Sequence, residues 1–155
     1  MSAEAAATVA LEGDEFRWEL ELLWAKYRGD SELDGEIIDA KVSMQLTGVG
    51  RFTAERPVNV FTADLAAFRE SLEELLGGRP QESTFLTLEQ DAGLVITRGT
   101  DDDVYDVEAF VLWRPSPELR ASQLRVAKRE LQVLLFGVQE ASEAFPVGTR
   151  WAEDA

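Results

Sequence analysis

The residues in this chain that could do chemistry are mostly carboxylates, and they gather in two short stretches. The first stretch reads DSELDGEIIDAK and ends at Lys41. Asp30, Glu32 and Asp34 stand where an EF-hand calcium loop takes oxygen ligands, and Gly35 stands where that loop turns. The closing position of such a loop needs a bidentate glutamate, and Lys41 occupies it. The stretch is therefore not expected to bind calcium.

The second stretch, GTDDDVYDVE, contains five carboxylates between residues 101 and 108. Carboxylate oxygens suit Mg²⁺ or Ca²⁺, but neighbouring residues of a strand point to opposite faces, so few of them can converge on one ion. A charged turn is expected here. We expect no metal site and no cofactor.

Nucleophilic catalysis lacks its usual parts in this chain. It has no histidine and no cysteine, which removes the commonest general base and the thiolate nucleophile. No G-x-S-x-G elbow, glycine-rich phosphate loop or S-x-x-K motif is present. The chain is expected not to be an enzyme, and no catalytic residue is assigned.

Charge narrows the classes of partner. Thirty acidic against 15 basic residues give a formal net charge of −15, which repels nucleic acid and anionic membranes and attracts a basic protein. No signal peptide or spanning apolar run is present, so a cytoplasmic protein is expected. The oligomeric state is left open. The candidate partner-binding residues are the carboxylates of both stretches: Asp30, Glu32, Asp34, Glu36, Asp39, Asp101, Asp102, Asp103, Asp106 and Glu108.

The elements that must position these carboxylates follow from the spacing of apolar residues. Alternation predicts strands over 16–24, with Trp18 and Trp24 in the core, over 38–46, and from Phe52 towards Val60, where Pro57 indicates an edge or a bulge. The first acidic stretch therefore joins two strands, whereas an EF-hand needs two helices.

Further along the chain, helical spacing and alternation occur in turn. Residues 63–77 are predicted to form a helix, capped by Thr62 and ended by a left-handed Gly77, with apolar residues inward at Leu65, Phe68, Leu72, Leu75 and Leu76. A hairpin over 83–89 and 93–98 and a strand over 103–113 follow. Residues 118–145 are either one long helix or a strand of about 120–128 followed by a helix of about 129–144.

These elements predict an α+β fold: a single domain over 1–146, with a mostly antiparallel twisted β-sheet of about 7–8 strands and two amphipathic α-helices, and a tail over 147–155.

Three segments carry a resemblance to a known family: DGEIIDAKVSM at 34–44, GRFTAERPVNVFTADLAAFRESLEEL at 50–75, and the ending LQVLLFGVQEASEAFP. They resemble the WapI-like immunity proteins of bacterial toxin systems. The resemblance implies a β-hairpin before the last helix and stoichiometric inhibition of a toxin's C-terminal nuclease domain.

Two functions are weighed on these grounds. The first is a non-enzymatic cytoplasmic immunity protein that binds and inhibits a basic toxin domain. The alternative is a small-ligand-binding α+β domain with an apolar pocket lined by Trp18, Trp24 and Trp113.

Overall fold

Eight antiparallel strands and two helices make up the fold of the computed structural model, which describes residues 5–26, 36–48, 50–79, 81–99, 103–112 and 118–147. The predicted α+β class is confirmed, and the strands divide into two four-stranded sheets, with orders β1-β2-β3-β4 and β5-β6-β7-β8. The elements are β1 (Ala7–Glu12), β2 (Phe16–Ala25), β3 (Ile37–Leu46), β4 (Phe52–Phe61), α1 (Thr62–Leu76), β5 (Glu82–Leu86), β6 (Ala92–Arg98), β7 (Val104–Leu112), β8 (Glu118–Ala127) and α2 (Lys128–Ala144).

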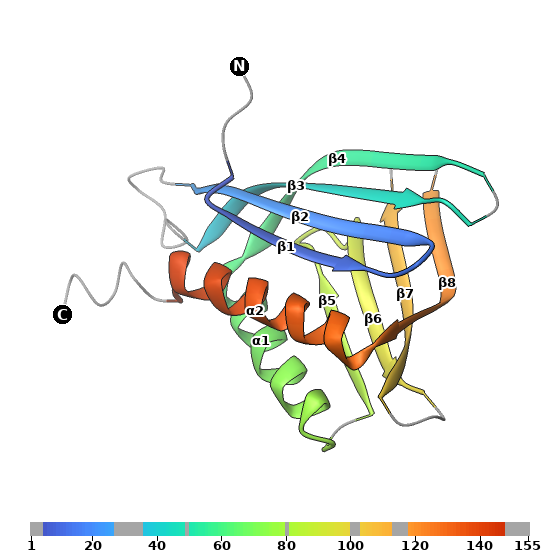
Figure 1. The fold of residues 1–155 in the computed structure, drawn as a ribbon. Coiled ribbons are helices and arrows are strands. Elements are labelled where there is room, and N and C mark those ends of the chain that lie inside the picture. Colours follow the sequence, from blue (N-terminus) through green and yellow to red (C-terminus); the bar gives the residue numbers. More distant parts are fainter. Residues whose placement is uncertain are drawn as a thin grey trace.

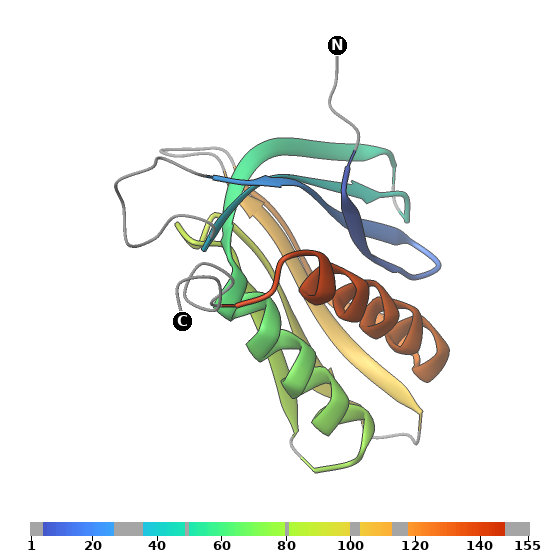
Figure 2. The ribbon, with the colours of Figure 1, turned by 90° about the vertical axis from the view of Figure 1, so that its left-hand side faces the viewer.

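The two sheets cross, and the two helices fill the wedge between them. In Figure 1 the strands of the first sheet run across the molecule, and those of the second run nearly upright beneath them. The sheets approach each other where β3 and β4 contact β7. On the open side, seen in Figure 2, α1 packs along β5 and α2 packs along β1. Each helix thus follows one sheet in sequence and packs against an edge strand of the other.

The core lies between the inner faces of the sheets and the buried stripes of the helices. Trp18 on β2 meets the ring of Phe85 on β5 edge-on, with ring centroids 6.1 Å apart. Phe68 on α1 packs against the same ring at 5.1 Å. Because three elements meet at one ring, removing it would loosen both sheets and α1 together.

The prediction that Trp24 lies in the core is wrong. Its side chain is 50% exposed, whereas Trp18 is fully buried. The pairing of β2 with β3 shifts between Leu22 and Trp24, and this bulge moves Trp24 to the outer face, opposite Asp39.

Both ends of α1 differ from expectation. Thr62 is the first helical residue and caps nothing; its hydroxyl donates to Glu36 Oε2 at 2.7 Å. Gly77 has a right-handed φ of −79°, and the left-handed residue is Gly78, with a φ of +86°. The Gly78 N–H donates to the carbonyl of Leu75, so the second glycine of the pair ends the helix.

The last segment forms a strand and then a helix, as the family resemblance implies. β8 pairs with β7, and α2 begins directly after it. The buried side of α2 contains Leu131, Leu134, Val138 and Ala141, with Phe145 buried just beyond its end. Within the described part of the chain, neither helix is long and apolar enough to cross a membrane.

Candidate functional site

The outer face of the second sheet is solvent-facing and carries part of the second acidic stretch. Three rows of cross-strand neighbours run across this outer face: Glu82, Thr97, Asp106 and Arg125; then Thr84, Val95 and Glu108; then Leu86, Gly93, Phe110 and Arg120. Alternation along each strand brings these side chains to one side of the sheet.

The structure places the sequence-predicted carboxylates in two regions. Asp106 lies 3.7 Å from Arg125, and Glu108 pairs with Arg120, both on the outer face. Asp103, with a φ of 65°, precedes β7, and its carbonyl accepts from the Lys128 N–H at 3.0 Å.

The described part of the first acidic stretch, residues 36–41, lies on the other sheet, with Glu36 beside the start of α1. Asp39 pairs with Lys26 at 3.0 Å, and Glu36 accepts the Thr62 hydroxyl hydrogen bond. The remaining candidates, Asp30, Glu32, Asp34, Asp101 and Asp102, lie outside the described residues. In the described part of the chain, no group of three or more Asp, Glu, His or Cys side chains is arranged so that it could hold a metal ion.

Two hollows border the outer face. The larger, of about 600 Å³, lies over β6, β7 and β8, and Asp106, Glu108 and Gln123 are among its lining residues. It coincides with a bulge in β8, where Ser122 and Gln123 stand opposite the single residue Glu108 and Gln123 has a φ of 60°. This bulge could not be read from the sequence, so the hollow was not expected.

The smaller hollow, of about 400 Å³, lies between α1 and β5. Its walls are Phe61, Asp64 and Ala67 on one side and residues 84–88 with Gln90 on the other. The row of Thr84, Val95 and Glu108 links this hollow to the larger one across the outer face. Because Ile37 pairs with Phe61, residues 36 and 37 of the first acidic stretch adjoin the smaller hollow.

Asp64 lines the smaller hollow and was not among the carboxylates selected from the sequence. Partial burial raises the pKa of its carboxyl above the ordinary value. Within the described residues no cation or donor pairs with this carboxylate. A partly desolvated carboxylate without a partner favours the approach of a cation.

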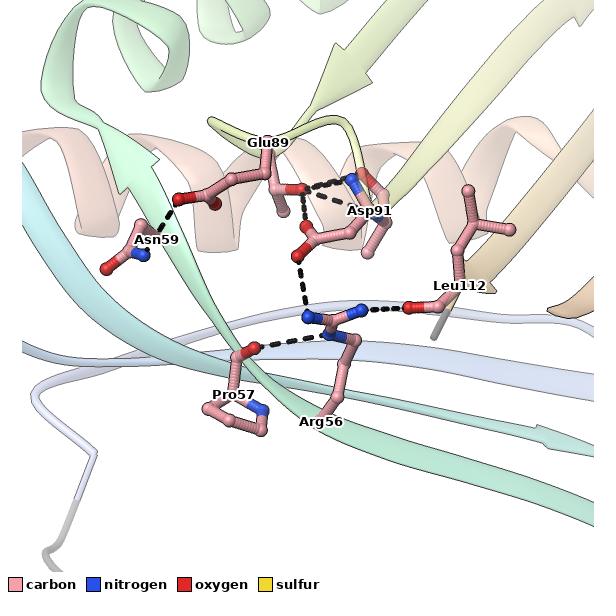
Figure 3. A network of polar contacts seen from close by, with 8 residues as sticks. Arg56, Pro57, Asn59, Glu89, Asp91 and Leu112 are labelled. Carbon is pink, nitrogen blue, oxygen red and sulfur yellow. Dashed lines mark hydrogen bonds and ion pairs between the residues drawn. The ribbon is translucent and has the colours of Figure 1, made fainter. Parts of the chain in front are cut away.

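A polar network, shown in Figure 3, holds the β5–β6 turn, whose residues Leu88 and Gln90 line the smaller hollow. Arg56 Nη2 lies 3.0 Å from Asp91 Oδ2, and Arg56 Nη1 donates to the carbonyl of Leu112. Asp91 also accepts from the Thr87 hydroxyl. The Leu88 N–H donates to the carbonyl of Asn59 at 2.8 Å. The network therefore fixes the β5–β6 turn against β4 of the first sheet.

Trp18 and Trp24 do not line a common pocket of the kind that the alternative hypothesis requires. Trp18 is fully buried in the core, and Trp24 is half exposed on the outer face of the first sheet. Trp113 lies outside the described residues. Within the described part, the buried Trp18 Nε1 has no hydrogen-bond partner, and the ring packs against Phe85.

The fold belongs to the α+β class. A unit of four antiparallel strands followed by one helix occurs twice in succession along the chain. No protein-family model matches the chain, and no curated protein matches it significantly. Among solved structures it is similar to the plant transcriptional regulator PBF-2, with a TM-score of 0.56 and 9% sequence identity over 99% of this chain and 98% of the other. At that identity the similarity shows the fold alone.

Proposed function

We propose that this chain is a non-enzymatic cytoplasmic immunity protein that binds a basic toxin domain and blocks it. The observation that carries the proposal is the outer face of the second sheet with its two hollows, bordered by Asp64, Asp106 and Glu108. Carboxylates on a concave surface attract and orient a basic partner, and here they stand beside Arg125, which lines the larger hollow and pairs with Asp106.

The charge of the whole chain supports a basic protein as the partner. The formal net charge is −15, and nuclease domains are basic because they hold phosphates. The same charge argues against nucleic acid as a partner, so the role of the plant transcriptional regulator is not carried over. The family resemblance of residues 34–44, 50–75 and 131–146 supports a toxin domain in particular.

The ion pairs on the outer face are compatible with this role. Asp106 and Glu108 pair with Arg125 and Arg120 at the surface, where such pairs contribute only about 0–1 kcal/mol. A partner cation can therefore replace an internal one at small cost. The proposal does not require carboxylates that stand unpaired before binding.

The experiment pairs this chain with the C-terminal domain of a large secreted protein, sought among the genes beside its own. We expect a one-to-one complex by calorimetry and restored growth when both are expressed together. Absence of a complex and absence of protection would contradict the proposal. A charge-matched acidic protein of unrelated fold is the control for nonspecific neutralisation.

A further inference from the structure

β5 is one of the two edge strands of the second sheet, and within the described residues one side of its backbone is unpaired. The Thr87 N–H donates to the carbonyl of Ala92, and the Arg98 N–H donates to that of Gln81. Hydrogen-bonded and non-hydrogen-bonded pairs alternate in an antiparallel ladder. The odd-numbered residues of β5 therefore bond to β6, and the N–H and C=O groups of Thr84 and Leu86 point away from it.

The free edge of β5 opens onto the smaller hollow. Thr84, Leu86 and Leu88 are among the residues that line it, and α1 forms the opposite wall. Thr84 is exposed and Leu86 half-buried. An exposed strand edge beside a groove is the geometry that accepts an added strand from another chain.

The other three edges of the sheets are less suited to strand addition. α2 packs so closely along β1 that a Cβ at Gly137 would lie 3.0 Å from the carbonyl oxygen of Thr8. β4 contains Pro57, which has no N–H to donate, and β8 is interrupted by its bulge at Gln123. Among the described strands, β5 combines a regular edge with a hollow.

The negative charge beside the hollow favours an added strand that carries basic side chains. Asp64 lines it without a cationic partner in the described part of the chain, and Glu82 lies on β5 itself. We infer that the free edge of β5 takes an extended segment of the basic partner, with a lysine or arginine side chain of that segment on Asp64. This inference rests on the proposed function and adds the mode of binding.

Two substitutions test the edge without touching the core. Thr84→Pro removes the outward N–H and leaves the bonds to β6, with Thr84→Val as the control that keeps the N–H. Ala67→Arg places a cation and a long side chain in the hollow, and Ala144→Arg makes the same change at the exposed end of α2. Circular dichroism and melting temperature establish that each variant folds.

The measurement is the Kd for the C-terminal domain of the neighbouring secreted protein, with amide hydrogen exchange of the wild-type complex. Thr84→Pro and Ala67→Arg should each weaken binding by about tenfold or more, and the two controls should not. The Thr84 and Leu86 amides should exchange more slowly in the complex. Wild-type binding with unchanged Kd in both variants and unprotected amides would overturn strand addition and leave the proposed function standing. Absence of wild-type binding would overturn both.

Discussion

Arg56 and Asp91 form an ion pair, 3.0 Å between Nη2 and Oδ2, that joins the first sheet to the second. Arg56 lies on β4, and Asp91 directly precedes β6, with a side chain only 5% exposed. A carboxylate so deeply buried is stabilised by its partners and becomes costly if one of them is removed.

Arg56→Met should therefore destabilise the protein by about 3 kcal/mol, because it leaves Asp91 buried without its cation. Urea denaturation measures the change. Arg17→Met, which breaks the exposed pairs of Arg17 with Glu12 and Glu19, is the matched control and should cost about 1 kcal/mol or less. Equal effects of the two variants would show that the inter-sheet pair contributes no more than a surface pair.

Gly93→Ala should destabilise the second sheet by about 1–3 kcal/mol through overpacking. A Cβ at Gly93 would lie 2.4 Å from the carbonyl oxygen of Phe85 and 3.1 Å from the ring of Phe110. Phe110 cannot retreat freely, because the Arg120 guanidinium lies over its ring at 4.5 Å. Thr84→Ala on the neighbouring strand is the control, and thermal unfolding is the measurement. A variant as stable as the wild type would mean that this contact relaxes without cost.

Phe68→Ala should cost about 3–5 kcal/mol, because Phe68 packs against Phe85 in the core. Glu70→Ala, on the exposed side of the same helix, should change the free energy of unfolding by about 0.5 kcal/mol or less. Chemical denaturation of both variants measures the difference. Similar losses of stability in the two variants would contradict the burial of the Phe68 side of α1.

Asp64 should make stability depend on pH in a defined direction. Its pKa in the folded chain is raised above the ordinary 3.8 by burial, so the folded state holds the proton more tightly than the unfolded state. The contribution of Asp64 to the free energy of unfolding is therefore favourable at acid pH and is lost as pH rises through the pKa of the folded state. Relative to the wild type, Asp64→Asn should gain stability as pH rises from the ordinary pKa of 3.8 through the raised pKa of the folded state. A relative loss over that range, measured by urea titration, would reverse the sign of this prediction.

Apolar spacing predicted most elements, because alternation and the helical stripe directly reflect which side chains are buried. It failed where a bulge interrupts the alternation. On β8, Leu119 and Ala121 face inward before the bulge and Leu124 and Val126 after it, so the pattern changes phase at Gln123 and resembles a helix. The bulge after Leu22 misplaced Trp24 for the same reason. β1 was not predicted, because its six residues follow an alanine-rich start with little alternation.

The candidate site was predictable only in part. The carboxylates of 101–108 were selected by charge, and Asp106 and Glu108 do lie on the outer face. The division into two sheets, the free edge of β5 and the hollow beside Asp64 depend on which strands pair, and side-chain periodicity is the same for either arrangement. In the sequence, Asp64 is a carboxylate in the first turn of a helix, a position that the helix dipole alone favours. Its position therefore did not indicate a binding site.

The most direct test of the proposed function is the rate at which this chain associates with the proposed toxin domain, measured as a function of ionic strength. Glu82→Lys with Asp106→Lys reverses charge on the outer face of the second sheet, and Glu12→Lys with Glu55→Lys makes the same change on the first. Wild-type association should be fast and should slow with salt, and the second-sheet variant should lose about tenfold or more of the rate at low salt. The first-sheet variant should lose much less. Equal rates for both variants, or no salt dependence in the wild type, would contradict binding of a basic partner at this face.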